Sequence, residues 1–138
     1  MNLLLDTHAF LWWVEGAPAL SKRARAIISD EDNRCFLSLA SSWEISIKVS
    51  LGKLKLPSSF DQYIPQQLAA NGFIQLQIEF RHVARVSSLP FHHRDPFDRL
   101  LVAQAMEEKL VIVTADPMFS RSGNGYVLAF GRGLASTR

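Results

Sequence analysis

The run Leu110-Val111-Ile112-Val113-Thr114 limits the possible folds of this chain more than any other stretch, because it is the clearest strand in the sequence. A second apolar run, Leu3–Leu5, has no polar residue between its members, which is typical of a strand that is covered on both faces. Strands of this kind occur in parallel sheets, whose strands are joined by helical crossovers. The sequence therefore predicts an α/β fold.

Segments with helical periodicity separate the expected strands. The further strands are expected at 35–37, 73–78 and 126–130, and the helices at 9–14, 22–28, 41–52, 59–70, 79–87 and 96–109. Pro65 is expected to kink or split the fourth helix, and Val83 and Val86 are expected to face inward from the fifth. Alternating strands and helices favour a parallel sheet with right-handed connections.

Length and composition are those of one ordinary globular domain. The chain has 138 residues, of which 48% are hydrophobic and 20% charged, and a net charge of +2 says little about partners. We expect a single domain over residues 1–130 and a flexible tail over 131–138. The single Cys35 cannot form an internal disulfide, and no apolar run has the length of a signal peptide or a membrane span. These features predict a cytoplasmic protein.

Four acidic residues are predicted to lie at one edge of the sheet. Asp6 and Asp116 each follow a predicted strand, whereas Glu44 and Asp98 are expected in the first turns of helices. In a parallel α/β architecture these positions meet beyond the carboxyl ends of the strands, where ligands bind. Because like charges raise one another's pKa values, four carboxylates at one edge indicate a cation between them.

Asp98 is the most informative of the four. Asp95 can cap the helix and Pro96 fits its first position, so that Asp98 falls in line with Leu101 and Val102, in the middle of an apolar stripe. A carboxylate in such a stripe is costly unless the free N–H groups of the first turn or a cation compensate for its burial. This stretch alone leaves capping and metal ligation equally open.

Glu44 has two structural interpretations beside the functional one. Its spacing from Ser41 fits a capping box, and Lys48 lies one helical turn further on, where a surface ion pair can form. Taken alone, this local pattern favours a structural role for Glu44 over a catalytic one.

The types of ligand indicate which metal the acids would hold. Carboxylate oxygens suit Mg²⁺ or Mn²⁺, and carboxylates holding Mg²⁺ typically act on phosphate esters. Zinc is disfavoured because His92 and His93 are adjacent, His8 and His82 have no partner at ligand spacing, and Cys35 stands alone.

Several motifs carry a family resemblance: Met1-Asn2-Leu3-Leu4-Leu5-Asp6-Thr7-His8, Ser41-Ser42-Trp43-Glu44-Ile45 with Lys48, Gly52-Lys53-Leu54, His93-Arg94-Asp95-Pro96-Phe97-Asp98-Arg99-Leu100-Leu101, and Thr114-Ala115-Asp116. With these motifs in this order over residues 1 to about 120, the chain resembles PIN-domain proteins, and more narrowly the VapC-type toxins of bacterial toxin–antitoxin pairs. The resemblance implies a three-layer α/β/α fold around a mostly parallel sheet of four to five strands. It also implies a Mg²⁺-dependent endoribonuclease, for which Mn²⁺ is a possible substitute.

The resemblance further implies roles for particular residues. The positions that match the family's acidic metal site are Asp6, Glu44, Asp98 and Asp116, and Thr114 matches a Ser/Thr position beside it. A homodimer and an antitoxin that covers the active site are implied as partners. Basic residues near these acids in the sequence are candidates for contacts to the RNA backbone: Lys48, Lys53, Arg94 and Arg99. Each of them fits a solvated surface charge or a helix ion pair at least as well.

Other functional classes fit less well. A haloacid-dehalogenase-like phosphatase needs a second Asp where His8 stands, and a response-regulator receiver needs an acidic pair where Thr7 follows Asp6. The remaining alternative is a catalytically inactive PIN domain that serves as a binding module. That alternative predicts the loss of acidic positions, whereas all four are present. The three tryptophans, Trp12, Trp13 and Trp43, exceed the needs of a small core. Some are expected in the core, and an exposed one suits a dimer or antitoxin surface.

Overall fold

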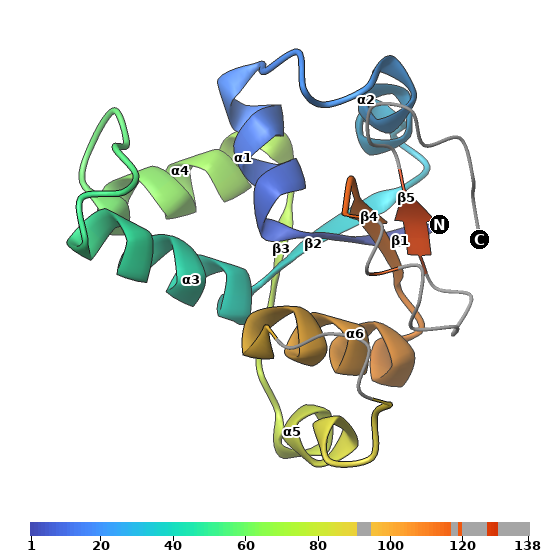
Figure 1. Ribbon diagram of the computed structural model, residues 1–138. Helices are drawn as coiled ribbons and strands as arrows, with labels where there is room; N and C mark the ends of the chain where they lie inside the picture. Colours follow the sequence, from blue (N-terminus) through green and yellow to red (C-terminus); the bar gives the residue numbers. More distant parts are fainter. Residues whose placement is uncertain (91–94, 117–118, 120–126, 130–138) are drawn as a thin grey trace.

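Five parallel strands form one sheet in the order β3-β2-β1-β4-β5 (Figure 1). The computed structural model describes residues 1–90, 95–116, 119 and 127–129. The strands are β1 (Asn2–Leu5), β2 (Arg34–Ser38), β3 (Ile74–Leu76), β4 (Val111–Thr114) and β5 (Val127–Ala129). Every predicted strand is therefore confirmed, and the predicted tail over 131–138 lies outside the described residues.

The helices follow the strands in the alternation that the sequence predicts. They are α1 (Thr7–Glu15), α2 (Lys22–Ser29), α3 (Leu39–Ser50), α4 (Phe60–Asn71), α5 (Phe80–Val86) and α6 (Pro96–Glu108). None of the helices in the described ranges is both long and apolar enough to cross a membrane.

Helices cover both faces of the sheet, because side chains alternate along each central strand. Leu3 and Leu5 of β1 pack with residues of α1, α2 and α4, whereas Leu4 packs with residues of α6. Ile112 and Val113 of β4 divide in the same way between the two clusters. Figure 1 shows the resulting layers, with α1, α2 and α4 above the sheet and α6 below it, and α5 lying against the outer side of α6.

The register of the strands places the candidate acids. Leu5 lies opposite both Leu37 and Val113, so β1, β2 and β4 end at the same level. The Asp6 N–H donates to the Val113 carbonyl at 3.1 Å, which keeps Asp6 beside the end of β4. The chain therefore leaves three neighbouring strands at one edge, as the parallel topology requires.

The predicted start of α3 was wrong by two residues. The helix begins at Leu39, and Ser38 caps it by accepting from the Ala40 N–H at 3.0 Å. Ser41 is instead buried inside the first turn, and Glu44 lies in the second turn. The capping box of Ser41 and Glu44 does not form, because the cap is available one turn earlier, at the last residue of β2.

The structure also bears on predictions about two other helices. Pro65 does not split α4, because the helix runs from Phe60 to Asn71 with Pro65 inside. The prediction that Val83 faces inward from α5 was wrong. The inward residue of α5 is His82, which is fully buried, whereas Val83 is 51% exposed. Hydrophobic periodicity predicted the wrong buried face of α5, because the polar residue His82 occupies the buried position.

Candidate active site at the carboxyl edge of the sheet

Asp6 is held at the junction of β1 and α1 by two hydrogen bonds. Its Oδ1 accepts from the Ala9 N–H at 2.7 Å, so Asp6 is the N-cap of α1. Its Oδ2 accepts from the Thr114 hydroxyl at 2.5 Å. Burial raises the pKa of Asp6, and the bonds from Thr114 and Ala9 oppose that rise. The carboxylate is thus buried and fixed in orientation.

Thr114 connects Asp6 to the second candidate aspartate. The Thr114 side chain is buried at the end of β4, and its Oγ1 accepts from the Asp116 N–H at 2.9 Å while it donates to Asp6. One hydroxyl therefore holds the side chain that follows β1 and the backbone that follows β4 in a common arrangement.

Asp98 lies in the first turn of α6, where the charges of the other candidate acids act on it. Its pKa is raised to about 7, most of all by burial, and further by the negative charges of Asp95, Asp6, Glu44 and Asp116. The structure thus brings the four predicted acids close enough that each of the other three raises the pKa of Asp98. Hard oxygen donors that repel one another in this way are suited to a divalent cation such as Mg²⁺ or Mn²⁺.

Glu44 reaches the site from α3. Its Oε1 accepts from the Thr7 hydroxyl at 2.7 Å, and its Oε2 pairs with Lys48 at 3.4 Å. The predicted ion pair with Lys48 is therefore present. The contact with Thr7 places Glu44 beside the first turn of α1, which Asp6 caps.

A cavity of about 310 Å³ opens beside the acids. It is lined by Asp6, His8, Trp12, Ala115 and Asp116. The rings of His8 and Trp12 are stacked, with 5.7 Å between their centroids and 29° between their planes. Sequence reasoning did not place these two residues at the site. Their separation by four residues, in a helix that begins at Thr7 and is capped by Asp6, was the available signal.

The predicted RNA-contacting residues occupy different situations. Lys48 is paired with Glu44, and Lys53 is exposed in the connection after α3. The Arg99 guanidinium donates to the carbonyls of Val86 at 3.0 Å and Pro90 at 3.2 Å, so it ties the segment after α5 to α6. Arg94 lies outside the described residues.

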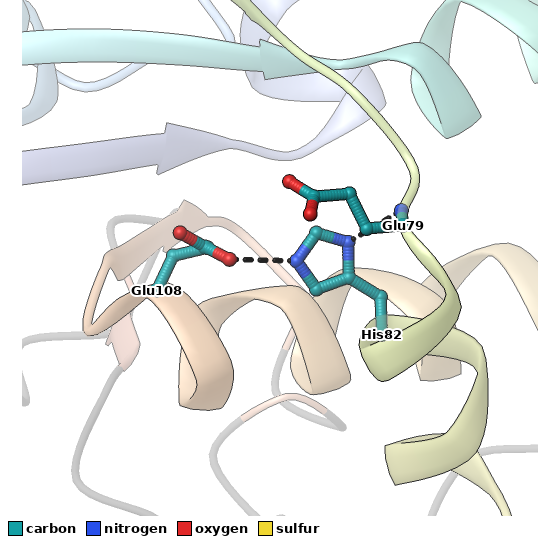
Figure 2. Close-up of side chains that lie close together, drawn as sticks. All are labelled: Glu79, His82 and Glu108. Atoms are coloured by element: carbon teal, nitrogen blue, oxygen red, sulfur yellow. Dashed lines mark hydrogen bonds and ion pairs between the residues drawn. The ribbon is translucent and has the colours of Figure 1, made fainter.

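A second cluster of potential ligands lies between α5 and the C-terminal end of α6. Glu79, His82 and Glu108 each place one ligand atom within 4.8 Å of the others (Figure 2). His82 was expected to have no partner at ligand spacing in the sequence, but it has a partner in the folded chain. Its partner Glu108 is 26 residues away, on a different helix, a relation that spacing within one motif does not reveal.

The contacts of this second cluster are those of a structural network. The Nδ1 of His82 accepts from the Glu79 N–H at 3.0 Å, so in the neutral ring Nε2 carries the proton and donates to Glu108 at 2.8 Å. The Arg81 guanidinium already contacts Glu108, and it also lies 3.4 Å from Glu79. A protein cation therefore stands where a metal would be needed. Within the described ranges, this is the group with three such close ligand atoms, since the four acids at the sheet edge are more widely spaced.

Comparison with known proteins identifies the family. A model of the PIN domain matches residues 3–124. A curated relative, Ribonuclease VapC16 of Mycobacterium tuberculosis, is 40% identical over 68 residues. The matched stretch is 48% of this chain and 48% of that relative, so it spans about half the length of each protein.

Solved structures of low identity share the fold. The structure of VapBC2 from Rickettsia felis bound to a DNA fragment from its promoter matches with a TM-score of 0.69 at 14% identity, over 94% of this chain and 99% of that chain. A toxin–antitoxin complex from Klebsiella pneumoniae matches with a TM-score of 0.63 at 17% identity, over 92% and 96% of the two chains. The predicted three-layer α/β/α fold is thus confirmed. Because the family model matches residues 3–124, which is most of the chain, the chain belongs to the PIN domain family.

Proposed function

We propose that this protein is a divalent-metal-dependent endoribonuclease and the toxin of a toxin–antitoxin pair. The proposal rests on the Thr114 hydroxyl that joins Asp6 to the backbone of Asp116, and on the charges of Asp6, Glu44 and Asp116, which raise the pKa of Asp98. Similarity to a curated ribonuclease and to chains from toxin–antitoxin complexes supports both parts of it.

The acids divide the work at the site. Asp6 and Asp98 are the first candidates to bind Mg²⁺ or Mn²⁺, followed by Asp116, while Glu44 binds the ion or positions the attacking water. When bound, the ion neutralises charge on the phosphodiester and lowers the pKa of a water molecule. Thr114 is a positioning residue, because its hydroxyl holds Asp6 and the backbone of Asp116 together.

Basic side chains contact the RNA backbone in this proposal. Lys53 is exposed and available for a phosphate, and Lys48 lies beside Glu44. Arg99 contacts the RNA backbone in this proposal while it keeps its hydrogen bonds to the carbonyls of Val86 and Pro90. Arg94 is proposed from its sequence position alone.

The proposed partners are a cognate antitoxin and a second copy of the chain. Trp43 supports a partner surface because it is 57% exposed and packs edge-on against Phe97, with 5.1 Å between the ring centroids. Expression of the chain is expected to arrest growth, and co-expression of the small protein encoded next to it is expected to restore growth. Unimpaired growth with soluble, folded protein would favour an inactive binding module instead.

A cleavage assay tests the nuclease directly. Purified protein is expected to cut single-stranded RNA with Mg²⁺ or Mn²⁺ and to stop in EDTA. Asp98→Asn keeps the shape of the side chain but removes the charge that a cation needs, so it is expected to abolish cleavage. Asp95→Asn is the matched control, because Asn caps a helix about as well as Asp and cleavage should persist. Cleavage that survives chelation, or a fully active Asp98→Asn variant, would contradict the mechanism.

A further inference from the structure

We propose that the cavity beside the acids binds one unpaired nucleobase of the RNA strand, held against the rings of His8 and Trp12. The proposal deepens the nuclease proposed above by assigning a positioning site for the substrate. It rests on that proposed function and on three features of the cavity: its position, its aromatic wall and its polar edge.

The position of the cavity follows from how α1 begins. Asp6 caps the helix, so His8 is its second residue and Trp12 lies one turn further on the same side. Asp6 and Asp116 line the same cavity as the two rings. A nucleotide whose phosphate lies at the acids therefore has its base within reach of His8 and Trp12.

The aromatic wall suits a base because one ring is anchored and the other is exposed. Trp12 is half-buried and packs against the core cluster beneath α1, which fixes its plane. His8 is exposed and stacks on Trp12, so its ring extends the platform into solvent. Stacking on aromatic side chains is a general means of binding single-stranded nucleic acid, because every base has a π-face.

The polar edge and the size of the cavity limit what can enter. Asp6 and Asp116 form the polar edge of the cavity, where the proposed cation and the phosphate lie, so the base itself lies against the rings. A paired base has its faces covered by neighbours and its edge occupied, so the cavity requires a base that is out of the stack. The site therefore selects single-stranded or looped RNA over duplex.

Binding of labelled RNA by fluorescence anisotropy tests the proposal. The Asp98→Asn variant serves as background so that the RNA stays intact, and oligonucleotides with one abasic position are scanned along the strand. One abasic position near the site is expected to weaken binding about tenfold. His8→Ala is expected to weaken binding of the intact strand by a similar factor and to remove the penalty at that abasic position, since the two changes delete one interaction.

Two further variants separate stacking from other effects. His8→Phe keeps a planar ring and is expected to restore binding to within about threefold of the parent. Phe80→Ala removes an aromatic ring that is 84% exposed on α5, outside the cavity, and is expected to leave binding unchanged. An abasic penalty of equal size in the parent and in His8→Ala would overturn the proposal, as would equal weakening by Phe80→Ala.

The design distinguishes this proposal from the nuclease proposal. Base-dependent binding without cleavage by the wild-type protein would support the base site and contradict the nuclease. Metal-dependent cleavage without any abasic penalty would support the nuclease and overturn the base site. In an active enzyme, His8→Ala is expected to raise KM about tenfold with little change in kcat, because the contact is made equally in the ground and transition states.

Discussion

At the scale of single residues, the Thr114 hydroxyl controls more of the site than its size suggests. It donates to a buried carboxylate oxygen of Asp6 and accepts from the N–H of Asp116. Leaving a buried polar group without its hydrogen-bond partner costs about 1–3 kcal/mol of stability. The net contribution of a typical hydrogen bond to stability is smaller. The loss of this one oxygen therefore affects two of the four acids.

Thr114→Val is expected to lower the free energy of unfolding by about 2 kcal/mol, because the shape is kept while Asp6 and Asp116 each lose a hydrogen bond. Thr114→Ser retains the hydroxyl and is the control, with an expected loss below about 1 kcal/mol. Urea denaturation at pH 7 in EDTA measures both. Equal stability of the valine variant and the wild-type protein would show that the hydroxyl does not hold the site.

Asp98 makes stability depend on pH in a defined direction. Its pKa is about 7 in the folded protein and 3.8 ordinarily, so between about pH 4 and pH 7 the folded state binds the extra proton. Stability is then expected to fall as pH rises through this window and to level off above it. In EDTA, Asp98→Asn should be more stable than the wild type at pH 8 by about 1–3 kcal/mol and equal to it near pH 3.5.

Asp95→Asn provides an internal check on the cause of this effect. The charge of Asp95 raises the pKa of Asp98, second only to burial. Asp95→Asn should therefore raise the free energy of unfolding at pH 8 by less than Asp98→Asn does, while the cap on α6 is retained. Chemical denaturation of both variants across the pH range gives the comparison, and a pH-independent difference for Asp98→Asn would contradict the assigned cause.

At the scale of elements, α5 is held to α6 chiefly by polar contacts. Beyond the bond of His82 to Glu108, Arg85 pairs with Glu107, with its Nε 2.6 Å from the carboxylate. Gln104 of α6 is buried, donates to the Gln77 carbonyl at 3.2 Å and accepts from Ser38 at 2.5 Å. This network joins α6 to the start of α3 on one side and to the segment before α5 on the other, and thereby fixes the helix that carries Asp98.

His82→Ala is expected to destabilise the protein by about 2–4 kcal/mol, because it opens space in a buried position and leaves Glu108 and the Glu79 N–H without this partner. Val83→Ala is the matched control on the same helix. Its side chain is 51% exposed, so a change within about 0.5 kcal/mol is expected. Thermal unfolding compares the two variants, and similar losses would show that α5 is not held through His82.

At the scale of the whole molecule, the fold was largely predictable because the strands carry an unambiguous signal. Leu3–Leu5 and Val111–Val113 are apolar on both faces, and helices cover both faces in the structure. The parallel order then brought Asp6 and Asp116 to one edge without any long-range information.

The parts that could not be predicted depend on contacts between distant segments. The buried side of α5 is polar because His82 faces Glu108 of α6. The wall of the cavity depends on where α1 begins relative to the end of β4. The start of α3 was misplaced because Ser38 and Ser41 both fit a cap, and only the register of β2 selects Ser38. Local patterns offer alternatives in such cases, and packing chooses among them.

The two carboxylate clusters give the whole molecule a final test, because both could in principle hold a cation. Mn²⁺ that binds only the folded state raises the free energy of unfolding by about 2.7 kcal/mol at a concentration one hundred times its Kd. We expect this gain for the wild type and its loss in Asp116→Asn, which keeps the volume of the side chain while removing a charge at the sheet edge. Glu79→Gln makes the same kind of change in the second cluster, where Arg81 already contacts Glu79 and Glu108, and it should retain the full gain. Thermal unfolding with and without Mn²⁺ measures both variants. If the gain disappears in Glu79→Gln and survives in Asp116→Asn, the cation binds between α5 and α6, and the acids at the sheet edge must be assigned another role.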